Sequence, residues 1–388
     1  MEFDFDNPPD RRDSDSIKWA KYDGRHVLPM WVADMDFASP PCVIEALHAR
    51  VSHGVFGYGQ APVSLHDAVV DTLNADFNWR IDPSWIVWLP GLVPALNMVC
   101  RAFCDSNEAT LTATPIYPPF LKAPLFSQRE CVKVPLQLSG DRWLWDLAAA
   151  EAAVSTNTRV LMLCNPHNPV GRAWTHDELL ALAAFAERHD LIVCSDEIHA
   201  DLILDPSSRH VPFASLDAAA ARNCITLMAP SKTYNIPGLG CSMAIVENEA
   251  LRRRLRTAMR GIIPDVNVMG FAAAEAAYRH GRAWRAALIE YLRANTVLVS
   301  ESIRAIVGLK TYPVQATYLS WIDARDLGVA DPHIFFEEAG VGLSNGADFG
   351  APGFVRLNFG CPRERLRLAL VRMKSAVANR RVGTKQPA

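Results

Sequence analysis

The amino-acid sequence predicts an α/β fold, with a mainly parallel central sheet in a large domain and a smaller α+β domain. The chain has 388 residues, more than twice the usual length of about 150 for one domain, so we expect two domains. Half of the residues are hydrophobic and 21% are charged, which is typical of a globular protein with a large core. The middle of the chain alternates short apolar runs with helical periodicity, and this alternation predicts parallel strands.

A strand, helix and strand in the middle of the chain form the clearest unit. Residues 159–164 and 191–195 are short apolar runs, and residues 175–189 between them repeat apolar side chains at the helical period. Thr175 and Glu178 have the spacing of a capping box, which marks the start of this helix. The pattern predicts a βαβ unit, and buried strands joined by crossovers indicate a parallel sheet.

Further strands and helices complete the two expected domains. Apolar runs predict strands at 224–228, 241–246, 318–322 and 353–359, and helices are expected at 283–306 and 363–376. The first forty residues are too irregular to form a domain, so we expect them to pack on the C-terminal unit. We therefore assign residues 46–285 to the large domain, and residues 1–45 with 286–388 to the small one.

The charge balance argues against nucleic acid and membrane partners. The chain has 39 Lys and Arg residues against 42 Asp and Glu residues, a formal net charge of −3. Such a balance provides no overall field for a polyanion or an anionic lipid surface. No apolar run approaches the roughly 18 residues needed to span a bilayer. We expect a small-molecule substrate.

The cysteines suggest a reducing compartment and no metal. Nine cysteines are scattered along the chain, and its acidic, polar start has no secretory signal, so we expect a cytoplasmic protein. Cys100 and Cys104 lie four residues apart in an expected helix, but no second Cys or His pair has zinc-ligand spacing. Core packing explains these two thiols better than metal binding does, and we assign no metal.

Several common motifs are absent. There is no GxGxxG, no GxxxxGK[ST] and no HExxH. Their absence argues against a dinucleotide-binding protein, a nucleoside triphosphate-binding protein and a zinc protease. Residues 342–346, GLSNG, match GxSxG. The sequence that follows them, ADFGAPG, cannot form the helix that a nucleophile elbow requires. We treat this match as accidental.

Three loops that follow apolar strands carry the informative residues. They are NPHNPVG at 165–171, SDEIH at 195–199 and APSKT at 229–233, and ligands of such folds bind beyond the carboxyl ends of the strands. Taken alone, Lys232 is more often a surface charge than a Schiff-base amine, and Asp196 is more often a loop or cap carboxylate than a catalytic one. Together, a lysine, a carboxylate, an asparagine and an aromatic residue are the set that pyridoxal phosphate needs.

The order of these motifs resembles a known enzyme family. NPHNPVG, SDEIHADL, APSKTYN and GFVRLNFG resemble the aminotransferase-fold pyridoxal-phosphate enzymes of fold type I. The strings PMWVADMDF, GVFGYG, PGLVPALN, TPIYPPF and HVPFASL are similar to the cystathionine β-lyase-like carbon–sulfur lyase branch of that class I/II family. The resemblance runs from about residue 29 to residue 361, nearly the whole chain.

The resemblance implies a cofactor site. Lys232 would be the Schiff-base lysine, and Asp196 would hold the protonated pyridine nitrogen. Asn168, and His199 where many relatives have Tyr, would bind the ring oxygen, while Tyr117 would stack on the ring. Further expected contacts are Ser231, Val93 and Pro94 at the phosphate, where Gly91 leads into a helix. The expected cofactor is pyridoxal 5'-phosphate.

The resemblance also implies substrate contacts and a dimer. Arg356 would clamp the substrate α-carboxylate, with Asn168 and Ala33 beside it. Tyr58 would reach the cofactor phosphate of a neighbouring subunit, which would make a homodimer with shared active sites. One departure stands out: many relatives carry Arg or Lys eight residues after the lysine, and this chain has Gly240.

The activity implied is α,β-elimination of L-cysteine S-conjugates such as cystathionine, giving thiol, pyruvate and ammonia. In this reading Lys232 both anchors the cofactor and removes the Cα proton. An aminotransferase on the same scaffold is the main alternative, because it uses nearly all of the same residues. A regulatory protein that retains the fold is a further alternative, and the complete set of functional residues argues against it.

Overall fold

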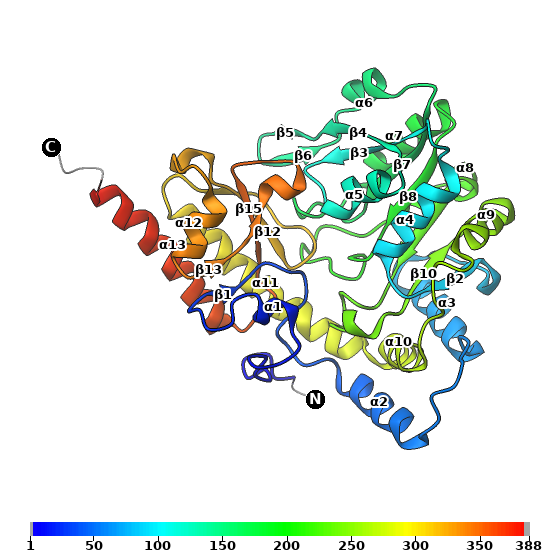
Figure 1. Ribbon diagram of the computed structural model, residues 1–388, viewed down its shortest axis with the longest axis horizontal. Coiled ribbons are helices and arrows are strands. Elements are labelled where there is room, and N and C mark those ends of the chain that lie inside the picture. The colour runs from blue at the N-terminus through cyan, green and yellow to red at the C-terminus, as the bar shows by residue number, and fades with distance from the viewer. Residues whose placement is uncertain (1–2, 384–388) are drawn as a thin grey trace.

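A seven-stranded sheet forms the centre of the computed structural model, which describes residues 3–383 (Figure 1). The strand order is β2-β10-β9-β8-β7-β3-β4. The strands are β2 (Ile86–Leu89), β3 (Ala109–Thr114), β4 (Glu130–Pro135), β7 (Thr158–Cys164), β8 (Ile192–Asp196), β9 (Cys224–Met228) and β10 (Ser242–Ile245). A mainly parallel α/β sheet was predicted from the sequence and is confirmed.

One strand runs against the expected direction. The pairs β4·β3, β3·β7, β7·β8 and β8·β9 are parallel, but β10 is antiparallel to both β9 and β2. The connection from β9 to β10 contains only turns and one short 3-10 helix, Pro237–Leu239, instead of a crossover helix. Without a crossover the chain returns along the same edge of the sheet, and the next strand is antiparallel.

Both faces of the sheet are buried at strand β7, which explains the apolar run of that strand. In β7, Val160 and Met162 pack in one core cluster, while Leu161 and Leu163 pack in another. The first cluster contains side chains of α4 and α9, and the second contains side chains of α3 and α7. Successive strand side chains point to opposite faces, so helices on both faces require apolar residues at every position.

Helices surround the seven-stranded sheet, and one of them, α7, has the clearest signal in the sequence. Helix α7 begins after Thr175, and Thr175 and Glu178 form the predicted capping box. The helices are α2 (Pro41–His53), α3 (Val63–Phe77), α4 (Leu92–Phe103), α5 (Pro118–Phe126), α6 (Leu147–Ala153), α7 (His176–Arg188), α8 (Ala218–Arg222), α9 (Glu249–Met259) and α10 (Val268–His280). A small hairpin, β5 (Gln137–Ser139) with β6 (Arg142–Leu144), lies beside them.

A four-stranded antiparallel sheet forms the second part of the molecule. Its order is β11-β12-β15-β14, with β11 (Lys310–Thr311), β12 (Leu319–Asp323), β14 (Ser344–Asn345) and β15 (Phe354–Asn358). The helices α11 (Arg282–Arg304), α12 (Pro332–Glu338) and α13 (Arg363–Gly383) pack with it. The predicted closing helix is confirmed and extends seven residues beyond the expected end at 376. No helix within residues 3–383 has the length and apolar character that crossing a membrane requires.

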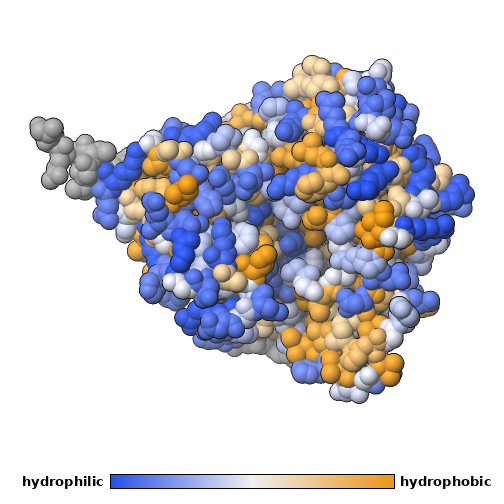
Figure 2. Space-filling model, in the orientation of Figure 1, coloured by the Kyte–Doolittle hydropathy of each residue, from blue (hydrophilic) through white to orange (hydrophobic). Residues whose placement is uncertain are grey.

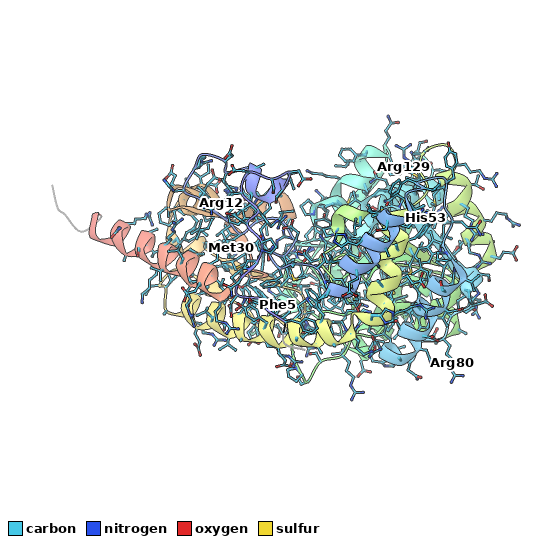
Figure 3. The ribbon with its side chains drawn as sticks, turned by 90° about the horizontal axis from the view of Figure 1, so that it is seen from below. Phe5, Arg12, Met30, His53, Arg80 and Arg129 are labelled. Carbon is cyan, nitrogen blue, oxygen red and sulfur yellow. The ribbon has the colours of Figure 1, made fainter. Side chains whose placement is uncertain are left out.

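The N-terminal segment lies against this second part. After α1 (Ile17–Ala20), strand β1 (Leu28–Pro29) pairs in parallel with β13 (Val341–Gly342). Phe5 packs against Trp284 of the long helix α11, with ring centroids 5.6 Å apart, and Figure 3 shows it beside that helix. These contacts bring residues of the first forty positions next to the C-terminal third of the chain.

Candidate active site

A cavity of about 190 Å³ opens where strands β7, β8 and β9 end. Figure 2 shows a hollow in the middle of this face, between the parts built on the two sheets. The cavity brings together nine of the eleven site residues expected from the sequence: Ala33, Val93, Pro94, Tyr117, Asn168, Asp196, His199, Ser231 and Lys232. Parallel strands place the residues that follow them at one edge of the sheet, so three separate loops meet there.

Lys232 lies in the turn that follows β9, with its amine directed at the N-terminal segment. Its Nζ donates a hydrogen bond of 2.6 Å to the carbonyl oxygen of Ala33. Desolvation lowers the pKa of Lys232 to about 8, and the nearby Arg356 guanidinium adds to this, although Asp34 and Asp196 act in the opposite direction. An amine with this pKa is partly neutral near pH 8 and can act as a nucleophile or base.

Asp196 is the last residue of β8 and is 4% exposed. Its Oδ1 accepts a hydrogen bond of 3.1 Å from the backbone N–H of Ile198. Burial raises the pKa of Asp196 to about 7, and the neighbouring Glu197 carboxylate contributes in the same direction. A buried carboxyl group of this kind favours a cationic partner in the cavity, because such a partner would offset the cost of ionisation.

Asn168, His199 and Tyr117 also line the cavity. Asn168 Oδ1 accepts a hydrogen bond of 3.0 Å from Arg356 Nη1, which leaves the Asn168 amide N–H₂ as the donor toward a ligand. His199 is buried, and desolvation together with the charges of Lys232 and Arg356 lowers its pKa to about 3, so the ring is neutral. The backbone N–H of Tyr117 donates to the Asn168 carbonyl oxygen at 3.1 Å, which holds the aromatic residue beside the amide.

Arg356 is not part of the cavity wall, but it adjoins the wall through Asn168. It lies in β15 of the second sheet and is 4% exposed. Its Nη2 donates to the Trp31 carbonyl oxygen at 2.9 Å, and the Phe349 ring lies under the guanidinium with the centroid at 4.7 Å. Desolvation lowers the pKa of Arg356 to about 10, so the group stays cationic at neutral pH.

The first turn of α4 forms another end of the cavity. Gly91 is the N-cap residue, and Leu92 is the first helical residue. The N–H of Ala95 is bonded to the Gly91 carbonyl oxygen and Pro94 has no N–H, so the N–H groups of Leu92 and Val93 remain for a ligand. Ser231 also lines this cavity, and an anion would be stabilised by such donors and by the helix dipole.

The position of Gly240 explains the departure noted in the sequence. Gly240 has φ +57°, and a Cβ atom there would lie 3.2 Å from the Pro90 carbonyl oxygen. A side chain at this position would be strained and would press on the backbone that leads into α4. The local backbone conformation therefore favours glycine over a residue with a side chain at this point.

Tyr58 lies apart from these residues. It is in the segment 54–59, which has neither helix nor strand, and its side chain is fully exposed. It does not line the cavity of its own chain.

Sequence reasoning missed several residues around the cavity. Cys164, Ile198, Cys241 and Ser242 line it, and Trp31 and Ser344 contact Arg356. The strings PMWVADMDF and GLSNG contain the last two residues, so a signal was present, but nothing in the sequence indicated that these strings meet.

The side chains present fit pyridoxal phosphate and an amino-acid substrate. Within the described residues, His199 Nδ1 and Arg356 Nε are buried polar atoms without a hydrogen-bond partner. Buried polar groups are normally satisfied, so such atoms beside a cavity indicate ligand contacts. The Lys232 amine matches the aldehyde of the cofactor, and the Asp196 carboxyl group matches the ring nitrogen. The Asn168 amide matches the ring oxygen, and the two helix N–H groups match the phosphate.

Comparison with known proteins agrees with this geometry. Residues 25–373 match the family model described as aminotransferase class I and II. Cystathionine beta-lyase PatB of Bacillus subtilis (strain 168) is 34% identical, with 96% of this chain and 100% of the relative covered. The crystal structure of OvoB has a TM-score of 0.95 and 48% identity over 97% of this chain and 99% of that chain.

A third relative contains the cofactor. The crystal structure of cystalysin from Treponema denticola, which contains pyridoxal 5'-phosphate, has a TM-score of 0.92 and 31% identity over 98% of this chain and 100% of that chain. The family and fold type expected from the motifs are thus confirmed. The chain belongs to the aminotransferase class I and II family.

Proposed function

We propose that the protein is a pyridoxal-phosphate-dependent carbon–sulfur β-lyase that eliminates the thiol from L-cysteine S-conjugates, releasing pyruvate and ammonia. The observation that carries the proposal is the convergence of Lys232, Asp196, Asn168 and His199 on one buried cavity, with Arg356 directly behind it. A cystathionine β-lyase at 34% identity over nearly the full length supports the same reaction.

The proposed cofactor contacts use the groups described above. The cofactor, when bound, would accept the electron pair left at Cα after the proton departs. Asp196 would hold the ring nitrogen, and its pKa would fall once a cationic partner lies beside the carboxylate. The Asn168 amide and the neutral His199 ring would bind the ring oxygen, Tyr117 would cover one face of the ring, and the N–H groups of Leu92 and Val93 with Ser231 would hold the phosphate.

Lys232 is the proposed base. Its Nζ lies in a partly desolvated position with a pKa of about 8, so a substantial fraction of the amine is neutral at mildly alkaline pH. Once Nζ is free of the cofactor, it would take the Cα proton and then return it in a later step. The Ala33 carbonyl oxygen, 2.6 Å from Nζ, would orient the amine during this transfer.

Arg356 is the proposed anchor for the substrate α-carboxylate. Its guanidinium is buried, and its Nε has no partner within the described residues. A desolvated guanidinium binds a carboxylate more strongly than an exposed one does, because water competes less. With the carboxylate held on one side and Lys232 on the other, the Cα–H bond would be oriented toward the base.

We also infer a homodimer in which Tyr58 enters the partner's cavity. Tyr58 is fully exposed, and Val55 and Phe56 in the same segment are more than half exposed. Figure 2 shows apolar side chains gathered over α2, next to this segment. A partner contact would bury these side chains. It would also place the Tyr58 phenol at the proposed phosphate-binding end of the partner's cavity, where Gly240 provides no basic side chain.

The assignment of two domains remains part of this proposal. The seven-stranded sheet within residues 86–245 and the four-stranded sheet within 310–358 support a large and a small domain. A cytoplasmic location is proposed on the cysteines, since all nine are free thiols and seven of them are buried.

The decisive experiment is a product assay on the holoenzyme with a panel of L-cysteine S-conjugates, cystathionine included, and no added keto acid. The proposal expects pyruvate, ammonia and free thiol in equal amounts. An amino acid without a β-leaving group, supplied with a keto acid, serves as the control. Rapid conversion of the control together with no pyruvate from any S-conjugate would identify an aminotransferase instead.

A further inference from the structure

The sequence GLSNG at 342–346 matches GxSxG, and the sequence analysis treats this match as accidental. In the structure, its two glycines and its serine have different roles. A Cβ atom at Gly342 would lie 2.3 Å from the Tyr22 hydroxyl, and one at Gly346 would lie 2.4 Å from the Phe354 carbonyl oxygen. Both glycines therefore permit close approach of neighbouring chain segments. Ser344 between them lies in strand β14, so no nucleophile elbow is formed.

Ser344 lies directly against Arg356. The two residues are partners in the antiparallel pairing of β14 with β15. Ser344 Oγ accepts a hydrogen bond of 3.2 Å from Arg356 Nη2 and donates one of 2.9 Å to the Trp31 carbonyl oxygen. Arg356 Nη2 also donates to that carbonyl, at 2.9 Å. The serine, the arginine and the N-terminal segment thus form one closed triangle of hydrogen bonds.

This triangle determines which edge of the guanidinium is available. Nη1 is bound to Asn168, Nη2 is bound to Ser344 and Trp31, and Phe349 covers one face. Nε is buried and has no partner within the described residues. A guanidinium has five N–H donors in a rigid plane, so contacts on its other atoms fix the direction in which Nε–H points.

We propose that Ser344 is a positioning residue that orients the Arg356 guanidinium for the substrate α-carboxylate and links it to the Trp31 carbonyl of the N-terminal segment. The inference rests on the proposed role of Arg356. Ser344 itself does not line the cavity, so it acts through the arginine. Its removal should weaken the binding of ligands with a carboxylate and leave ligands without one unaffected.

The test measures equilibrium binding, which needs no turnover. The holoenzyme is titrated with L-alanine and with ethylamine, its counterpart without the carboxylate, and the change in visible absorbance is followed. Ser344→Ala should raise the dissociation constant of L-alanine by about tenfold, since one charge-assisted hydrogen bond is lost while Trp31 still holds the guanidinium. The constant for ethylamine should stay the same. With S-conjugates, KM should rise by a similar factor while kcat changes less than twofold.

Two variants separate positioning from general damage. Ser344→Thr keeps the hydroxyl and should restore L-alanine binding to within about twofold to threefold. Ser320→Ala is the matched control, because Ser320 is a buried serine of the same sheet that bonds Thr311 instead of Arg356. It should bind both ligands as the wild type does.

Several outcomes would overturn the proposal. These are an unchanged L-alanine affinity in Ser344→Ala, an equal loss for both ligands, an equal loss in Ser320→Ala, or a wild type that binds ethylamine as tightly as L-alanine. A wild type that prefers L-alanine but forms no pyruvate from any S-conjugate would contradict the lyase activity alone. Its Ser344 variants would still decide the role of the serine.

Discussion

The cavity and the segment 54–59 present expected site residues in opposite ways. Asp196 and Arg356 are buried, and each has a defined hydrogen-bond partner in the same chain. Asp196 Oδ1 accepts from the nearby Ile198 N–H, and Arg356 donates to Asn168, 188 positions away. Tyr58 is fully exposed and belongs to neither a helix nor a strand. The difference teaches that one chain brings the lysine, the carboxylate and the guanidinium together by itself, whereas Tyr58 lies outside this cavity. Its proposed role would require a second chain.

Burial also changes the pKa values of the titratable groups in the cavity. Desolvation lowers the pKa of Lys232 and raises that of Asp196, so both groups are shifted toward neutrality. Such shifts are typical of functional sites, because a ligand of the right charge reverses their cost. Tests of the comparison should therefore show large effects in the cavity and smaller, partner-dependent effects at Tyr58.

The largest effect is expected from Lys232→Ala. This change would remove both the proposed cofactor anchor and the proposed base, and it should reduce lyase activity by at least about 10³-fold. Borohydride reduction of the wild type, followed by peptide mapping, should find the cofactor on Lys232 and on no other lysine. Lys122→Ala, an exposed lysine on α5, is the control and should remain yellow and active. Cofactor fixed to a different lysine would refute the site assignment.

Asp196→Ala should lower kcat by about 10²- to 10³-fold and leave most of the cofactor bound. In the proposed site the carboxylate would keep the ring nitrogen protonated, and the contacts to the lysine, the ring face and the phosphate would persist in the variant. Absorbance and kcat measured on the same preparation check both parts. Asp177→Ala, which changes an exposed carboxylate in the first turn of α7, should behave as the wild type does. Turnover at the wild-type rate in Asp196→Ala would remove its electronic role.

Arg356→Ala should lower kcat/KM by about 100-fold, mainly through KM, because the proposed anchor for the substrate carboxylate is lost. Arg356→Lys should recover little of this, since an ammonium group cannot replace the planar contacts to Asn168 and Trp31. Steady-state kinetics with one S-conjugate are sufficient. A fall in kcat with KM unchanged would contradict the anchoring role.

Mixing the subunits of the Tyr58→Ala and Lys232→Ala variants tests whether the segment 54–59 and the cavity act together across two chains. If Tyr58 enters the partner's cavity, random exchange of subunits should restore about a quarter of the wild-type activity, because half of the dimers have one intact site of two. Subunit exchange is confirmed by mass spectrometry of labelled chains. Exchange without recovery of activity would show that Tyr58 acts within its own chain or not at all.

The smallest effect is expected in the stability of the apoprotein. Asp196 has a folded-state pKa of about 7, above its unfolded value of about 3.9. The native state therefore retains a proton that the unfolded state releases, and the free energy of unfolding should fall as pH rises from about 4 to about 7. Denaturant titrations should show Asp196→Asn more stable than the wild type by about 1 to 3 kcal/mol at pH 7.5, and nearly equal at pH 4. If the free energy of unfolding had the same pH dependence in the two proteins, the raised pKa of Asp196 would be contradicted.

Local patterns predicted much of the fold because they report local physics. The capping box at Thr175 and Glu178 satisfies N–H groups three residues apart, so it was visible in the sequence. The apolar run of β7 reports burial on both faces of a sheet. The direction of β10 was not visible, since the residues of a strand are the same whichever way it runs beside its neighbour.

The sequence by itself determined the family, the parallel sheet and the residue types at the strand ends, because each is carried by short, ordered motifs. Only the tertiary structure decided which groups meet across the chain. Lys232 contacts Ala33, Arg356 contacts Asn168, and Ser344 contacts Trp31. These contacts join residues between 188 and 313 positions apart. The physical reason is that such contacts depend on pairing between distant segments. Pairing of β1 with β13, and of β14 with β15, brings Trp31, Ser344 and Arg356 together, and strand pairing over such separations depends on the whole fold.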